Sequence, residues 1–251
     1  GKEVAYLENR EVLKVVNLKS KKTRTIMTAD KNYSYADGDQ YYKWSPDGKW
    51  FLVSFGNPER VLSPEVGLVA SDGKGEIQNL TLSGYYDLDP KWVLDGKAMI
   101  WGSTRDGMFQ QSGSPVSGDV YAMFFSKEAF DRFNLSKEEL ALVKEQEDKN
   151  KDKDKKKEKV DKDSLKKELV IDWENLTERK KKLTTHTSSA NDWLLSKDGE
   201  KLYYLTVFDK GNDLWVTELR TKETKLLAKL GVRNPSMELS SDGKFIFLLA
   251  D

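Results

Sequence analysis

Several residue types and patterns are missing or scarce in this chain, and each absence narrows its function. The 251 residues include no cysteine, which excludes disulfides, thiolate catalysis and cysteine-bound zinc. The single histidine, His186, stands in a polar run and is expected to be a solvated loop residue. No serine occupies the Gly-x-Ser-x-Gly pattern of a nucleophile elbow, so we assign no catalytic residue. Carboxylates show no usable ligand spacing, so no metal or cofactor site is predicted.

An excess of one charge sign and long apolar runs are also absent. Lys plus Arg and Asp plus Glu number 42 each, which gives no electrostatic reason to expect nucleic acid or an anionic membrane as a partner. No apolar run approaches the roughly 18–20 residues of a membrane span. The opening residues do not form a signal peptide, although a chain that starts at Gly1 without Met tells little on that point.

The sequence does contain a recurring turn followed by a strand. In residues 44–55, WSPDGKWFLVSF, Pro46 is pre-set for the second position of a type I turn, Asp47 bonds its own backbone, and Gly48 accepts a positive φ. Aromatic and β-branched residues follow, which predicts a strand. The Asp-Gly pair recurs at Asp95, Asp198 and Asp242. The gaps of 48, 103 and 44 residues include two that fit one propeller blade of about 40–50 residues.

A second recurring piece follows the Asp-Gly strand. An acidic residue opens an alternating strand, and a polar turn and another short strand come after it. This piece starts at Glu65, Asp119 and Asp213. The unit is therefore a four-stranded antiparallel meander. One meander buries too little apolar surface alone, so copies must pack face to face around an axis. The predicted fold class is all-β, a β-propeller.

The repeat divides the chain, taken as one propeller segment over residues 1–251, into complete and partial blades. We expect complete blades over residues 41–81, 87–185 and 190–230, and partial blades over residues 4–28 and 237–250. Joining the two partial blades would give a ring of only about four blades, at the small end of the known range. We therefore expect a partial or open arc, cut from a larger propeller or completed by chain outside this sequence.

The 103-residue gap predicts a helical, Lys/Glu-rich insertion at residues 126–168 of the second complete blade. Ser136 and Glu139 form a capping box, and Leu135 and Leu140 occupy the hydrophobic-staple positions, so a helix is expected to begin there. A shorter helical turn is expected just before it, at residues 128–133.

The later part of the insertion is dominated by charge. From residue 144 to residue 163, 17 of 20 residues are charged, nine Lys against eight Asp or Glu. This pattern favours a solvated helix extension or mobile loop over a docking arm for a partner. The chain is expected to return to the sheet at residues 169–173 and 179–184.

Tryptophans recur near the turns. Trp44, Trp92 and Trp193 precede three of the Asp-Gly pairs by similar intervals. They could form a peptide-stacking surface, but repetition at a similar blade position favours packing between blades.

These repeats resemble the TolB-like propeller repeat. Residues 117–130 (SGDVYAMFFSKEAF), the charged insertion, and residues 171–179 (IDWENLTER) with Leu183 and Thr184 are more particularly similar to the propeller region of bacterial tricorn-like serine peptidases. The chain departs from the repeat at Leu94 and Lys197, where the turn lacks its proline. We expect those turns to close through their Asp-Gly pairs.

The resemblance implies a non-catalytic segment that gates or guides peptide substrates toward a protease core elsewhere, or mediates protein contacts. The catalytic half of that family, with its serine, histidine and acidic residues and its PDZ-like module, has no counterpart in this sequence. Two alternatives stay open: a stand-alone TolB-like protein-interaction propeller, and the propeller of a prolyl-oligopeptidase-like enzyme. The expected partner is a peptide or protein. The resemblance alone favours the periplasm, with the cytoplasm as the alternative.

Overall fold

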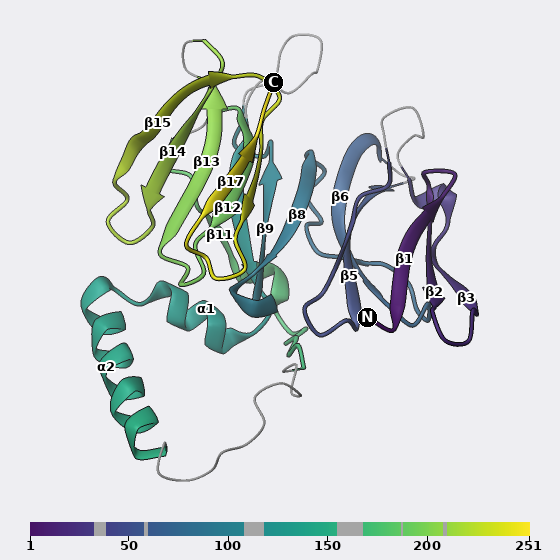
Figure 1. Ribbon diagram of the computed structural model, residues 1–251, viewed down its shortest axis with the longest axis horizontal. Helices are drawn as coiled ribbons and strands as arrows, with labels where there is room; N and C mark the ends of the chain where they lie inside the picture. Colours follow the sequence, from purple (N-terminus) through teal and green to yellow (C-terminus); the bar gives the residue numbers. More distant parts are fainter. Residues whose placement is uncertain (33–38, 58–59, 108–117, 155–167, 187, 208–209) are drawn as a thin grey trace.

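The structure is a computed structural model that describes residues 1–251 except 33–38, 58–59, 108–117, 155–167, 187 and 208–209 (Figure 1). The described strands form five antiparallel sheets that follow one another along the chain, numbered here sheets 1 to 5. In each sheet the strands pair in chain order. Sheets 2, 3 and 4 have four strands, sheet 1 has three and sheet 5 has two. The fold is therefore an all-β propeller arc with a charged, partly helical insertion.

The strands have the following bounds. Sheet 1 contains β1 (Glu3–Glu8), β2 (Val12–Asn17) and β3 (Thr23–Met27). Sheet 2 contains β4 (Tyr42–Trp44), β5 (Trp50–Asn57), β6 (Arg60–Ala70) and β7 (Gln78–Asn79). Sheet 3 contains β8 (Asp87–Val93), β9 (Ala98–Ser103), β10 (Asp119–Phe124) and β11 (Lys180–Lys182). Sheet 4 contains β12 (Ala190–Leu195), β13 (Lys201–Val207), β14 (Asn212–Glu218) and β15 (Thr224–Val232). Sheet 5 contains β16 (Ser236–Leu239) and β17 (Ile246–Leu249).

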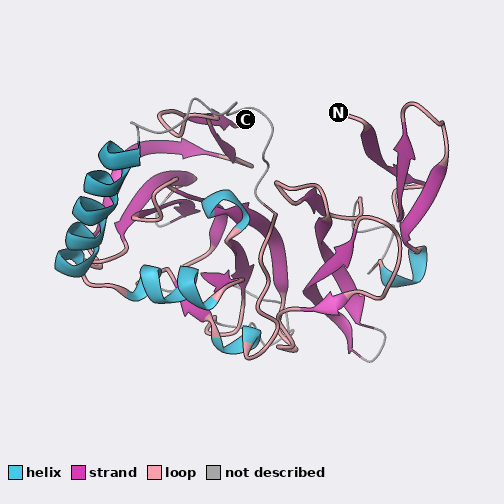
Figure 2. Ribbon diagram, turned by 90° about the horizontal axis from the view of Figure 1, so that it is seen from below, coloured by secondary structure: helices cyan, strands magenta, loops and turns pink. Residues whose placement is uncertain are grey.

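Neighbouring sheets pack face to face through four apolar cores, one for each adjacent pair. Strand β5 shows how the alternation of a strand serves two neighbours. Phe51 and Val53 pack with Leu13 of sheet 1, whereas Leu52 packs with Met99 of sheet 3, and all five are fully buried. Side chains of a strand point to opposite faces in turn, so each sheet binds the sheet before it and the sheet after it. Figure 2 shows the resulting open arc, with both chain ends on the same side.

The predicted turn geometry is confirmed where a serine stands two residues before the aspartate. In the first copy the Ser45 hydroxyl donates to Asp47 (2.6 Å) and accepts from the amide of Trp50 (2.9 Å), and Gly48 has a φ of 77°. The copies at Ser196 and Ser240 repeat these bonds. The copy at Asp95 differs because Val93 takes the serine position and offers no hydroxyl.

The Asp95 turn closes instead as a short 3-10 helix, η3 (Leu94–Gly96), with Leu94, Asp95 and Gly96 all at positive φ. Two further 3-10 turns are η1 (Ala29–Lys31) and η4 (Leu176–Glu178).

The insertion contains α1 (Lys127–Asn134) and α2 (Lys137–Asp154), which lie beyond one end of the strands (Figure 1). The capping box is confirmed: the Ser136 amide donates to the Glu139 carboxylate (2.7 Å) and the Glu139 amide to the Ser136 hydroxyl (3.2 Å). Leu140 is buried, as its staple position predicts. The charged run is helical as far as Asp154, and its remaining residues lie outside the described ranges.

Of the two segments expected to return to the sheet, one was predicted correctly and the other was wrong. Residues 180–182 pair with β10, but residues 169–173 form no strand. Their backbone amides are used differently, because Leu169 donates to Asp47 (2.9 Å) and Asp172 to the carbonyl of Phe125 (2.8 Å).

The recurring tryptophans pack between blades, as predicted. The Trp92 indole donates to the carbonyl of Lys43 in sheet 2 (3.2 Å). Trp193 of sheet 4 is 5% exposed and covers Gly102 of sheet 3, where an added Cβ would lie 2.4 Å from the ring. Trp44 packs on Phe51 in the core between sheets 1 and 2.

Candidate functional site

The single histidine of the sequence lies at the surface. His186 is exposed in a bend that leads into β12. Within the described ranges, no group of three histidine or acidic side chains is placed to hold a metal ion. Two acidic residues at the start of the third strands have structural partners. Asp119 accepts from Thr184, just after β11 (2.5 Å), and Asp213 accepts from the amides of Leu230 and Gly231 in β15.

Arg179 closes the neck where the insertion leaves and rejoins sheet 3. This residue is 7% exposed, and its guanidinium donates to the carbonyls of Phe124 (3.1 Å), Glu174 (2.8 Å) and Asp172. Phe124 ends β10, where the insertion begins, whereas Asp172 and Glu174 lie on its return. A single buried cation therefore joins both ends of the excursion. The IDWENLTER segment that carried the family resemblance ends at this arginine.

A second arginine fixes the far end of the insertion to sheet 4. Arg220 donates to the carbonyls of Phe133 (3.1 Å) and Leu135 at the elbow between α1 and α2. The same guanidinium pairs with both oxygens of Glu200 (2.9 and 3.2 Å). The two charged side chains are only 12% and 20% exposed, so this fork is shielded from solvent better than a surface pair. The elbow is thus held against the Asp-Gly turn of sheet 4.

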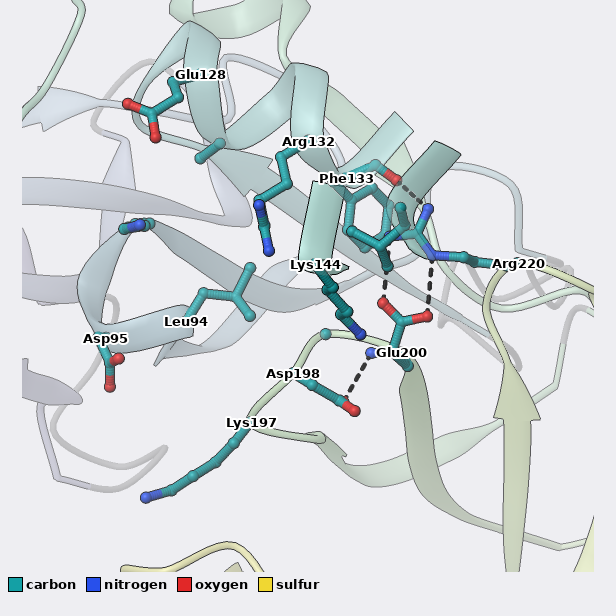
Figure 3. A pocket seen from close by; sticks show the side chains of 14 residues that line it. Leu94, Asp95, Glu128, Arg132, Phe133, Lys144, Lys197, Asp198, Glu200 and Arg220 are labelled. Atoms are coloured by element: carbon teal, nitrogen blue, oxygen red, sulfur yellow. Dashed lines mark hydrogen bonds and ion pairs between the residues drawn. The ribbon is translucent and has the colours of Figure 1, made fainter. Parts of the chain in front are cut away.

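A cavity of about 230 Å³ lies between the anchored helices and the Asp-Gly turns of sheets 3 and 4 (Figure 3). Leu94, Phe133 and Leu140 give it an apolar floor. Charged residues form the rim: Asp95, Lys97, Glu128, Arg132, Lys144, Lys197, Asp198, Glu200 and Arg220. In Figure 3 the Lys144 side chain points toward Asp198 and Glu200. The volume is below that of a typical cofactor site and suits a side chain or a peptide end.

Asp198 on the rim keeps its charge. Partial burial acts to raise the pKa of its carboxyl. Hydrogen bonds from the Ser196 hydroxyl and the Glu200 amide, together with nearby Lys144, outweigh that effect and hold the pKa below its usual value. The cavity therefore presents both signs of charge above an apolar floor.

A second polar cluster lies where the first strands of sheets 2 to 5 meet. The Lys91 ammonium donates to the Asp192 carboxylate and to the carbonyl of Trp193 (3.0 Å). Asp192 also accepts from the amide of Met237 (2.5 Å), and the Tyr41 hydroxyl donates to the carbonyl of Pro90 (2.8 Å). Burial, and then the charges of Asp89 and Asp192, raise the pKa of Tyr41, so its hydroxyl stays protonated.

This inner-edge cluster was missed in the sequence, although a signal was present. The side chains come from different sheets and meet only when the blades pack. However, three residues of this region, Tyr41, Asp89 and Asp192, each stand six positions before a turn aspartate, which marks one repeat position.

The arc of four-stranded meanders defines the class of this protein as a β-propeller. A scan against protein-family models and a search of curated proteins found no match. Among solved structures the fold is TolB-like: TolB from Acinetobacter baumannii is 17% identical, with a TM-score of 0.54 over 98% of this chain and 45% of that chain. The chain thus spans under half the length of TolB.

Other solved propellers are similarly close in fold. A puromycin-hydrolyzing peptidase from Mycobacterium tuberculosis is 11% identical, with a TM-score of 0.53 over 97% of this chain and 33% of that chain. An oligogalacturonate lyase in complex with manganese is 14% identical, with a TM-score of 0.51 over 94% of this chain and 49% of that chain. These proteins differ in activity, so the shared fold does not by itself assign one.

Proposed function

We propose that this chain is a non-catalytic β-propeller segment of a tricorn-like serine peptidase, where it guides or gates peptide substrates or mediates protein contacts. The observation that carries the proposal is the insertion, which Arg179 fixes at its neck and Arg220 at its elbow, so that it forms a cavity against two blades. Such a pre-formed surface lowers the ordering cost of binding. The fold likeness to a peptidase propeller supports the same proposal.

The chemistry of the cavity suits a peptide. Its apolar floor accepts an aliphatic or aromatic side chain, and its mixed rim offers partners for both backbone and charged groups. Its described lining includes no serine, threonine, histidine or cysteine, so it offers no hydroxyl or thiol nucleophile of the kind that serine and cysteine peptidases use. Binding without cleavage is the activity that this lining supports.

The organisation and location of the parent protein are part of the proposal. We propose that the blades over residues 41–81, 87–185 and 190–230 belong to one propeller larger than this arc, and that the parent functions in the periplasm. Within the described ranges, no helix has the length and apolar character of a membrane span.

The test is an assay of the pure 251-residue chain with fluorogenic peptides, unfolded casein and a fluorophosphonate that labels active serines. We expect no cleavage above buffer and no labelling. We also expect peptide binding that weakens in the double variant Arg132→Ala/Lys144→Ala and persists in Lys225→Ala, a control on exposed β15. Serine-dependent hydrolysis by the pure chain would contradict the proposal.

The parent reading frame separates the alternatives. A downstream PDZ-like module and serine peptidase half supports the proposed function. An α/β-hydrolase domain with Gly-x-Ser-x-Gly supports a prolyl-oligopeptidase-like parent, and a stop soon after Asp251 supports a stand-alone TolB-like propeller.

A further inference from the structure

Strand β8 has an irregularity at Asp89. Its pairing with β9 shifts register between Leu88 and Lys91, and Asp89 within that step has a φ of 52°. A non-glycine residue in this region is uncommon, and bulges re-aim side chains at functional sites. Asp89 is exposed.

Asp89 borders a cavity of about 290 Å³ between the first strands of sheets 3 and 4. Leu88 and Trp193 contribute apolar walls, and Thr104 and Asn191 contribute polar groups. This cavity is separate from the one under the insertion, because the two share no lining residue. It has room for one side chain and the backbone atoms attached to it.

The charge of Asp89 is not matched by its neighbours. Among the described residues, no hydrogen bond or ion pair reaches its carboxylate, and nearby Lys91 is already bound to Asp192 and to the carbonyl of Trp193. Asp119 also lines the cavity, but its charge is met by Lys182 (2.8 Å). The surrounding protein reduces the hydration of the Asp89 carboxyl, which raises its pKa. The positive charge of Lys91 lowers this pKa, and the negative charge of Asp192 raises it. Asp89, Lys91 and Asp192 together carry one uncompensated negative charge.

We propose that this pocket binds the N-terminal ammonium group of a peptide through Asp89, with the first side chain against Leu88 and Trp193. An ammonium donating to a carboxylate forms a charge-assisted hydrogen bond, and the partly enclosed pocket strengthens it. This inference rests on the proposed function only because it takes the ligand to be a peptide. It adds that the N-terminal end of the peptide is recognised, and that the pocket at Asp89 recognises it.

The experiment is calorimetry of the 251-residue chain with three probes: Leu-Ala-Ala amide, its N-acetyl form, and N-acetyl-Lys-Ala-Ala amide. We expect the free amine to bind about tenfold or more tighter than either acetylated peptide, and Asp89→Asn to abolish this preference. Asp72→Asn is the control, because Asp72 is an exposed aspartate in a turn of sheet 2 that lines neither of the two cavities. Asparagine also tolerates the φ of 52° at position 89, so Asp89→Asn changes the charge and keeps the backbone.

Each outcome decides the inference. Equal binding of free and acetylated peptides overturns it but leaves peptide binding, and hence the proposed function, intact. Equal binding of the lysine peptide assigns the pocket to side-chain ammonium groups and overturns the N-terminal assignment. If none of the three probes binds, the inference fails, whereas the proposed function still depends on the wider peptide assay. A loss in Asp72→Asn equal to that in Asp89→Asn also overturns it.

Discussion

At the scale of single residues, Arg179 holds the insertion neck with a buried cation that has carbonyl oxygens as its partners. Replacing it with alanine removes the donor that Arg179 provides to those carbonyls in a buried environment. We expect Arg179→Ala to lower the free energy of unfolding by about 3 kcal/mol or more, measured by urea denaturation.

The matched control for Arg179 is an arginine whose only described partner lies at the surface. Arg10 pairs with Asp39, and these side chains are 53% and 68% exposed. Arg10→Ala should cost under about 1 kcal/mol. Similar losses for the two variants would contradict the role given to Arg179.

Asp198 gives a residue-scale prediction about pH. Its pKa is lowered in the folded protein, so its contribution to stability is present above the unfolded value of about 3.9 and is lost as pH falls through the folded pKa. Asp198→Asn cannot titrate, so its stability should fall less steeply than that of the wild type below about pH 4. Chemical denaturation across this range measures the difference, and parallel curves would disprove the assignment.

At the scale of elements, the two helices of the insertion depend on Arg220. Arg220→Ala removes the bonds to the carbonyls of Phe133 and Leu135 and leaves Glu200 without its described ion-pair partner. We expect amide hydrogen exchange in α1 and α2 to rise about tenfold or more, with β9 and β10 still protected.

The control for the elbow lies inside the insertion. Arg132 pairs with Glu147 between α1 and α2, with these side chains 38% and 45% exposed. Because it makes no described bond to sheet 4, Arg132→Ala should leave the docking of the elbow largely intact. If hydrogen exchange in α1 and α2 rose in Arg132→Ala but not in Arg220→Ala, the role given to Arg220 would be contradicted.

The elements also show which features can be predicted from the sequence. The Asp-Gly turns and the capping box were predictable because their bonds join residues within five positions of one another. The Asp95 turn was predicted to close, but its 3-10 geometry (η3) was not predicted. The other turns depend on a serine such as Ser45, and that dependence is visible only in the hydrogen bonds of the structure. Residues 169–173 were predicted to form a strand because four of the five are apolar. In the structure the amide of Leu169 donates to Asp47 and the amide of Asp172 to the carbonyl of Phe125 instead.

At the scale of the whole molecule, the repeat predicted the arc of meanders but not the sites. The cavity under the insertion is lined by residues more than 100 positions apart in the sequence. Lys91 and Asp192, which form an ion pair, are 101 positions apart. Such residues come together only when neighbouring sheets pack, so the sequence pattern of a single blade cannot predict these contacts. The residues six positions before each turn aspartate were the one clue within reach.

The measurement that tests the central claim most directly is a titration of the isotope-labelled 251-residue chain with a defined peptide mixture, followed by NMR and by mass spectrometry of the peptides. The account predicts shifts at the two cavities, around Arg132 and around Asp89, with every peptide recovered intact. Cleaved peptides, or shifts confined to surfaces remote from both cavities, would contradict a non-catalytic peptide-binding propeller.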